Sequence, residues 1–138
     1  LFRSHYDYFD DYDFFRTLFT DLGLNDNHLR FIAFYQKENN QPNSWDASYT
    51  TADFDWLGHC KSAEVSEFVA QHFDLLVSFY KPNRYELKIV SAMSKARFKV
   101  GISNEDERLH DLIIDVALKD QGTFKVELVK YLKTLNKI

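Results

Sequence analysis

Apolar residues recur along this chain at two spacings, one typical of helices and the other of buried strands. In "DDYDFFRTLFTDLG" (10–23), Asp10 or Asp11 can cap a helix, and Gly23 can end it in the left-handed conformation. The apolar stripe of this helix consists of Phe15, Leu18, Phe19 and Leu22. The uninterrupted apolar run "LRFIAFYQ" (29–36) then predicts a buried strand.

The remaining chain continues this alternation of strands and amphipathic helices. Strands are expected at 53–56, 73–80, 97–102 and 112–118. Helices are expected after a cap at Ser62, from about Asn83 to Lys95, and after a cap at Thr123. The inward stripe expected for the 83–95 helix consists of Tyr85, Ile89, Ala92, Met93 and Ala96. Residues 37–52 lose all periodicity, collect Asn, Gln, Pro and Ser, and predict a surface loop.

Apolar strands that alternate with amphipathic helices indicate a parallel sheet with helices on both of its faces. The simplest arrangement is one α/β domain spanning residues 1–138, a three-layer sandwich. Its mostly parallel, open sheet would have about five strands, as in Rossmann-like or flavodoxin-like folds. No internal repeat and no second domain are visible in the sequence.

Four passages resemble a known family: "DFDWLGHCKSAEVSEFV", "FDLLVSFY", "ELKIVSAMSKARFKVGI" and "DLIIDVAL". They are similar to small uncharacterised α/β proteins from Bacteroidota, grouped as a domain of unknown function. The resemblance covers about residues 53–135, whereas residues 1–52 match mainly in the order of elements. Most of the matching positions are core residues and helix ends. The resemblance therefore implies a compact α/β domain and no catalytic residue.

Charge and composition argue against several function classes. The net charge is −4, and residues 1–60 carry 4 Lys/Arg against 10 Asp/Glu, whereas residues 61–138 carry 13 against 11. Nucleic-acid binders normally have a basic excess, so this balance argues against nucleic acid as a partner. The longest apolar runs are also too short to cross a membrane, which predicts a soluble protein.

Cys60 is the only cysteine, which excludes an internal disulfide and suits a reducing compartment, so we expect a cytoplasmic location. The chain begins at Leu1 without a Met. We expect residues upstream of Leu1 to be missing, and whether they include a targeting segment stays open.

Two polar stretches raise the question of chemistry. His59-Cys60 could be a base and a nucleophile, but adjacent residues rarely face each other, and a corner before a helix capped by Ser62 explains them better. The acidic stretch "HYDYFDDYD" (5–13) could hold Mg²⁺, or it could simply cap the first helix. The four glycines are isolated and form no phosphate-binding loop, so no cofactor is expected.

A basic stretch between 81 and 99 is the most suggestive feature of the second half. It consists of Lys81, Arg84, Lys88, Lys95, Arg97 and Lys99, with Glu86 as the single acid. Most such runs are solvated surface. The alternative is an acidic partner, for which the acidic half of a second copy is one candidate.

Two functions from different classes remain. The leading one is a non-catalytic domain with an interaction surface for an unknown protein partner or for a second copy. The rival is a small-molecule or metal-dependent binder or enzyme with a site at the carboxyl edge of the sheet, where residues 4–10, 80–84 and 102–108 would converge. The candidate lining residues of that site are Ser4, His5, Asp7, Asp10, Tyr80, Lys81 and Arg84.

Overall fold

The computed structural model of the chain describes residues 2–4, 11–24, 26–35, 47–80, 85–102, 108–117 and 119–137. Its strands are β1 (Phe2–Ser4), β2 (Ile32–Tyr35), β3 (Ala47–Thr50), β4 (Leu75–Phe79), β5 (Phe98–Ile102) and β6 (Leu112–Ile114). Its α-helices are α1 (Asp11–Asp21), α2 (Ala63–Ala70), α3 (Tyr85–Met93) and α4 (Gln121–Thr134). Two short 3-10 helices are η1 (Asp26–His28) and η3 (Thr51–Asp53).

All strand pairings in this part of the chain are parallel, which confirms the predicted α/β fold. The strand order is β3-β2-β1-β4-β5-β6, one strand more than the five expected. The chain therefore moves outward from β1 to β3, returns to the other side of β1 as β4, and moves outward again. Phe2 marks the centre, because it pairs with Ile32 of β2 and with Ser78 of β4.

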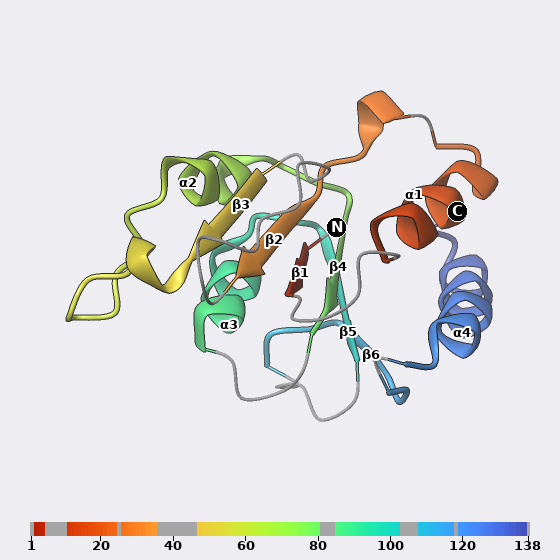
Figure 1. Cartoon of the computed structure of the whole chain (residues 1–138). Helices are drawn as coiled ribbons and strands as arrows, with labels where there is room; N and C mark the ends of the chain where they lie inside the picture. Colours follow the sequence, from red (N-terminus) through yellow and green to blue (C-terminus); the bar gives the residue numbers. More distant parts are fainter. Residues whose placement is uncertain are drawn as a thin grey trace.

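The helices form a layer on each side of the strands, with α2 and α3 on the left and α1 and α4 on the right in Figure 1. Successive residues of β4 point to opposite layers, as the pleat of a strand requires. Val77 and Phe79 belong to the core cluster with α1 and α4. Leu76 and Tyr80 belong to the cluster with α2 and α3.

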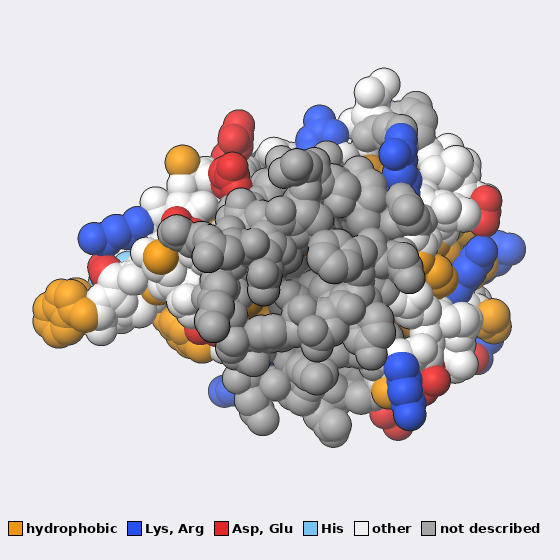
Figure 2. All heavy atoms as spheres, in the orientation of Figure 1, with side chains coloured by type: hydrophobic (Ala, Val, Ile, Leu, Met, Phe, Trp, Pro, Cys, Tyr) orange, Lys and Arg blue, Asp and Glu red, His pale blue; other side chains and the backbone are white. Residues whose placement is uncertain are grey.

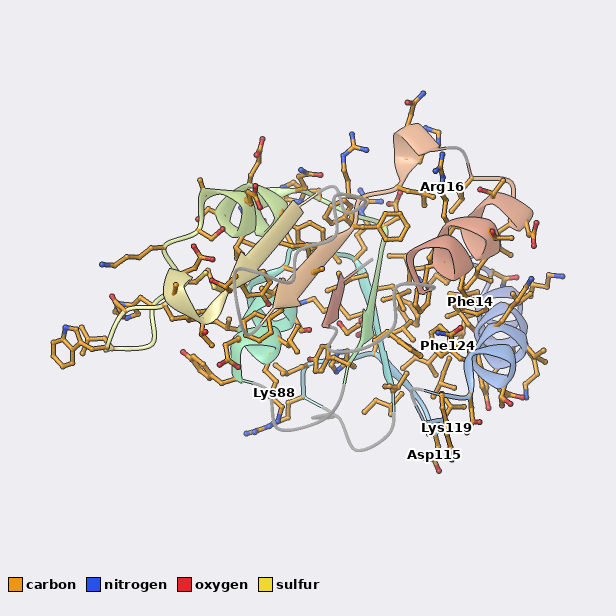
Figure 3. The ribbon with its side chains drawn as sticks, viewed as in Figure 1. Phe14, Arg16, Lys88, Asp115, Lys119 and Phe124 are labelled. Carbon is orange, nitrogen blue, oxygen red and sulfur yellow. The ribbon has the colours of Figure 1, made fainter. Side chains whose placement is uncertain are left out.

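Three aromatic rings fix α1, β4 and α4 to one another. The ring centroids of Phe15 and Phe79 lie 5.0 Å apart, those of Phe79 and Phe124 also 5.0 Å, and those of Phe15 and Phe124 6.0 Å. Figure 3 labels Phe124 in this layer between the strands and α4. The predicted first helix is confirmed, because α1 buries Phe15, Leu18 and Phe19 and is followed by Gly23 at φ +84°.

The predicted loop at 37–52 and the predicted strand at 53–56 are both wrong in part. Residues 47–50 form β3, in which Tyr49 is buried and donates a hydrogen bond to the Glu86 carbonyl at 2.6 Å. Residues 36–46 lie outside the described residues. Phe54 makes only an isolated antiparallel bridge with Cys60, so the strand expected at 53–56 is a 3-10 helix followed by a turn.

The predicted inward face of α3 is wrong in part, because Ile89 and Ala96 pack against the core but the other predicted positions are exposed. The helix buries Leu87, Val90 and Ser91, whereas Tyr85 and Met93 are exposed. Two serines, Ser91 and the buried Ser94 just after the helix, occupy positions where an apolar stripe would otherwise be visible. The helix ends at Met93, so Lys95 lies beyond it.

The other predicted helices are confirmed with small shifts at their ends. Ser62 caps α2, because its Oγ accepts a hydrogen bond from the Val65 N–H at 3.2 Å. The last helix, α4, begins at Gln121 rather than after Thr123, and it buries Phe124, Leu128 and Leu132. Within the described parts of the chain, none of the helices has both the length and the apolar character needed to cross a bilayer.

Candidate functional site

The feature of the described chain that stands out is a turn at residues 54–60, here called the Trp56 turn. Its two ends meet in the antiparallel bridge between Phe54 and Cys60. The Asp55 N–H donates to the His59 carbonyl at 2.9 Å, and the Gly58 N–H donates to the Asp55 carbonyl at 3.0 Å. Figure 1 shows this yellow segment projecting at the left, beyond β3, α2 and α3.

The side chain of Asp55 organises the tip of the turn. Its Oδ1 accepts hydrogen bonds from the backbone N–H groups of Leu57 at 2.9 Å and of His59 at 2.8 Å. The hydrogen bond from His59 and then that from Leu57 hold the pKa of Asp55 below its ordinary value, against the opposing effect of desolvation. Gly58 has φ +83°, a backbone conformation that glycine adopts without the steric penalty that a Cβ would cause. The tip is thus a locally closed structure.

Aromatic contacts attach the turn to the core. The Tyr85 hydroxyl at the start of α3 donates a hydrogen bond to the Gly58 carbonyl at 2.9 Å. The ring centroids of Tyr85 and Phe54 lie 6.2 Å apart. Phe54 in turn lies 6.1 Å from the ring of Tyr49, which lies 5.1 Å from Phe34 in β2. Burial raises the pKa of Tyr49 well above its ordinary value and keeps it a neutral donor.

The turn presents apolar side chains to solvent. Trp56 is 90% exposed, Leu57 56% and Tyr85 55%. Figure 2 shows hydrophobic side chains at the end of the same projection. A strand over 53–56 would place Trp56 on the same face as Phe54, but the chain reverses at residues 55–58 and the indole points to solvent. An exposed indole beside other apolar groups on a projecting turn is typical of a contact site.

His59 and Cys60 form the corner of this turn, as the sequence predicted. His59 Nδ1 lies 3.5 Å from Asp55 Oδ2. Burial raises the pKa of the half-buried Cys60 thiol, which is the opposite of the activation that a nucleophile requires. The chain then enters α2 through the Ser62 cap.

One of the predicted lining residues lies in the core. Tyr80 is fully buried, and its hydroxyl is 3.1 Å from Ser91 Oγ, which is itself 3.0 Å from Ser78 Oγ. Ser4 ends β1, where only its backbone is described. The other five candidates lie outside the described residues: His5, Asp7, Asp10, Lys81 and Arg84.

The basic stretch divides into residues with different surroundings. Lys99 Nζ donates to the Ser91 carbonyl at 2.7 Å, and desolvation lowers the pKa of Lys99. Lys88 is half-buried and points away from α3 at the lower left of Figure 3. Arg97 Nη1 lies 3.6 Å from Asp74 Oδ1, with both side chains exposed. Lys99 and Arg97 thus each interact with a group outside the basic stretch or with the backbone.

No group of three or more His, Cys, Asp or Glu side chains is gathered for a metal ion among the residues whose placement is described. This absence does not cover the acidic stretch at 5–13 for which Mg²⁺ was considered. Residues 5–10 are not described, and only the backbone of residues 11–13 is described.

The strand order and the helices on both faces define an α/β protein. A family model described as "Family of unknown function (DUF6913)" matches residues 4–135, and the chain belongs to that family. The match confirms the predicted domain of unknown function and extends it toward the amino terminus. Neither the search of curated proteins nor that of solved structures found a match. Family membership therefore assigns no activity.

Proposed function

We propose that this protein is a non-catalytic α/β domain that binds a partner protein through the Trp56 turn. The observation that carries the proposal is an indole that is 90% exposed at the tip of a turn closed by its own hydrogen bonds. Single exposed apolar residues are common on protein surfaces. Here, however, Trp56 and Leu57 belong to one projecting turn, and the exposed Tyr85 of α3 attaches that turn to the core.

The geometry of the turn also favours binding energetically. Binding costs entropy when loops and side chains must become ordered, and a turn that is already held by Asp55 and Gly58 reduces that cost. Tryptophan and tyrosine are the residues most often found to dominate binding energy at protein interfaces. The matching surface would be an apolar pocket that accepts the indole, with Leu57 and Tyr85 at its rim. A second copy of the chain is the alternative owner of that pocket.

The proposal includes three finer expectations from the sequence. The strand order supports a Rossmann-like, doubly wound arrangement. The single cysteine supports a cytoplasmic location. Origin in Bacteroidota stays a prediction from the resemblance.

Site-specific photo-cross-linking tests the proposal. A photoreactive benzoylphenylalanine replaces Leu57 in the tip, or Val126, which is at least as exposed but lies on α4, as the matched control. We expect a discrete adduct from position 57 in cells and none from position 126. Adding Trp56→Ala should abolish the adduct, and mass spectrometry then tells a second copy from another protein. Adducts that survive Trp56→Ala, or no adduct at position 57, would contradict the proposal.

A small-molecule or metal site at the carboxyl edge of the sheet is the second candidate function. It is favoured by the reversal of strand order between β1 and β4, because ligands of open α/β sheets bind at such a reversal. A thermal-shift screen with nucleotides, sugar phosphates and divalent metals tests it. A ligand at about 100 times its Kd should raise Tm by roughly 5–12 °C. The double change Asp10→Asn and Asp11→Asn should then remove the response, and a flat screen would count against this candidate.

A further inference from the structure

The helix α3 has a second apolar side, which faces away from the core. The residues that it buries are Leu87, Val90 and Ser91. At about 100° per residue, Tyr85 and Ala92 lie on the opposite side of the helix, with Met93 beside them. Tyr85 is 55% exposed and Met93 53%, and Ala92 is exposed as well. A helix that is apolar on both sides is normally covered on both, so the outer side of α3 is suited to a contact.

The charged side chains of this layer are divided between its two helices. α2 carries Glu64 and Glu67, both exposed, and no lysine or arginine. α3 carries Lys88, and the exposed Lys95 follows the end of the helix. Figure 3 shows Lys88 on the side of α3 that is turned away from α2. Glu86, the single acid of α3, is half-buried. The outer face of the layer therefore has an acidic half at α2 and a basic half at α3.

The two helices run in the same direction and begin at a similar level. Each connects two parallel strands, α2 between β3 and β4 and α3 between β4 and β5, so each runs against the strands. Both begin beside the Trp56 turn, because the turn leads into the cap of α2 and the Tyr85 hydroxyl of α3 donates to the Gly58 carbonyl. Glu67 is the fifth residue of α2 and Lys88 the fourth of α3, so the two lie at nearly the same level.

We propose that the outer face of α2 and α3 is the interface of a homodimer, in which α2 of each copy packs against α3 of the other copy. The occupant is a second copy because the face is its own complement, as a two-fold interface requires. A two-fold axis parallel to the helices brings Glu67 of one copy opposite Lys88 of the other at the same level, with Met93 nearer the centre. A two-fold axis across the helices would instead bring α2 against α2 and glutamates against glutamates. The charges therefore select the parallel axis.

The dimer is a property beyond partner binding by the Trp56 turn. A two-fold axis parallel to the helices keeps every residue at its level along the axis, so both Trp56 turns lie at the same end of the dimer. Two turns at one end give a bivalent binding surface, which strengthens attachment to a partner that presents two pockets. The helices have only 8 and 9 residues, so the interface is small and we expect a Kd in the micromolar range.

Sedimentation equilibrium of the purified chain tests the dimer. We expect a reversible monomer–dimer equilibrium between about 1 and about 500 µM. Met93→Glu places a charge within the interface and should weaken the dimer about tenfold or more. Val126→Glu on α4 is the matched control, because Val126 is at least as exposed, and it should leave the Kd unchanged. Far-UV circular dichroism checks that both variants are folded.

Charge reversal tests the arrangement of the two copies. Glu67→Lys and Lys88→Glu should each weaken the dimer about tenfold, because symmetry makes like charges meet twice. The two changes combined in one chain should restore the original Kd. Trp56→Ala should leave the dimer intact, so this experiment is independent of the proposal for the Trp56 turn. A chain that stays monomeric at about 500 µM, equal effects of Met93→Glu and Val126→Glu, a combined variant that is not restored, or loss of the dimer on Trp56→Ala would overturn the proposal.

Discussion

Trp56 and Tyr80 are both large aromatic residues outside the helices and strands, yet the fold places them in opposite environments. Trp56 is 90% exposed at the tip of its turn, whereas Tyr80 is fully buried beneath α3. The Tyr80 hydroxyl is hydrogen-bonded to that of Ser91, which is in turn hydrogen-bonded to that of Ser78. Trp56 instead lies on a turn held by its own backbone, by Asp55 and by the Tyr85 hydroxyl, and none of these hydrogen bonds involves the indole.

This difference separates a residue used for stability from a residue available for binding. A buried hydroxyl is costly unless it is hydrogen-bonded, and the serines of β4 and α3 meet that condition for Tyr80. The indole of Trp56 contributes little to the core, because the turn is closed without it. Substitutions in the two regions should therefore act on different measurements.

The largest effect on stability is expected from Tyr80→Ala. Removing a fully buried aromatic ring should lower the free energy of unfolding by about 3–5 kcal/mol. Urea denaturation followed by far-UV circular dichroism measures it. A loss of less than about 1 kcal/mol would show that Tyr80 is not a core residue. Tyr80 would then again be a candidate for the lining of a site at the carboxyl edge of the sheet.

A smaller loss is expected from Ser91→Ala. This change removes the hydroxyl that lies next to both Tyr80 and Ser78, at a cost of about 1–3 kcal/mol. Ser66→Ala in the exposed face of α2 is the matched control and should not destabilise the protein. Equal effects of the two changes in the same denaturation experiment would argue against a buried hydroxyl cluster.

A pH-dependent effect is expected from Asp55→Asn. The pKa of Asp55 is lowered in the folded state, so its contribution to stability is complete above the unfolded pKa of about 3.9 and is lost as the pH falls through the folded value. The difference in Tm between the original chain and Asp55→Asn should therefore be largest near neutral pH and should become smaller as the pH falls. Calorimetric scans from about pH 7 to about pH 3 measure it, and a difference that stays constant would refute the role of the charged carboxylate.

The smallest effect on stability is expected from Trp56→Ala. Because the indole is almost fully exposed, the free energy of unfolding should change by no more than about 0.5 kcal/mol. The same change should abolish the cross-link from position 57. A large loss of stability would mean that the indole packs against the domain.

The helices with continuous apolar stripes could be predicted from the sequence. Phe15, Leu18 and Phe19 in α1 and Phe124, Leu128 and Leu132 in α4 are buried as their spacing indicates. The inward face of α3 could not be predicted in the same way. Ser91 and Ser94 are buried where apolar residues would be expected. Ser91 is accommodated there by hydrogen bonds to Ser78 and Tyr80, which are distant in the sequence.

The candidate site was missed for a related reason. In "DFDW" the alternation of apolar and acidic residues is that of a half-buried strand, but Asp55 accepts two backbone hydrogen bonds and reverses the chain. Gly58, which follows two residues after Trp56, was the available signal for a turn. β3 was missed because its short run, "ASYT", lies beside a polar stretch.

The most direct test of the central claim is quenching of Trp56 fluorescence in a Trp45→Phe background, which leaves Trp56 as the sole tryptophan. We expect emission typical of an indole in water and quenching by acrylamide nearly as efficient as that of a free tryptophan derivative. A blue-shifted emission that resists acrylamide in the monomeric protein would contradict it, because the indole would then be part of the core.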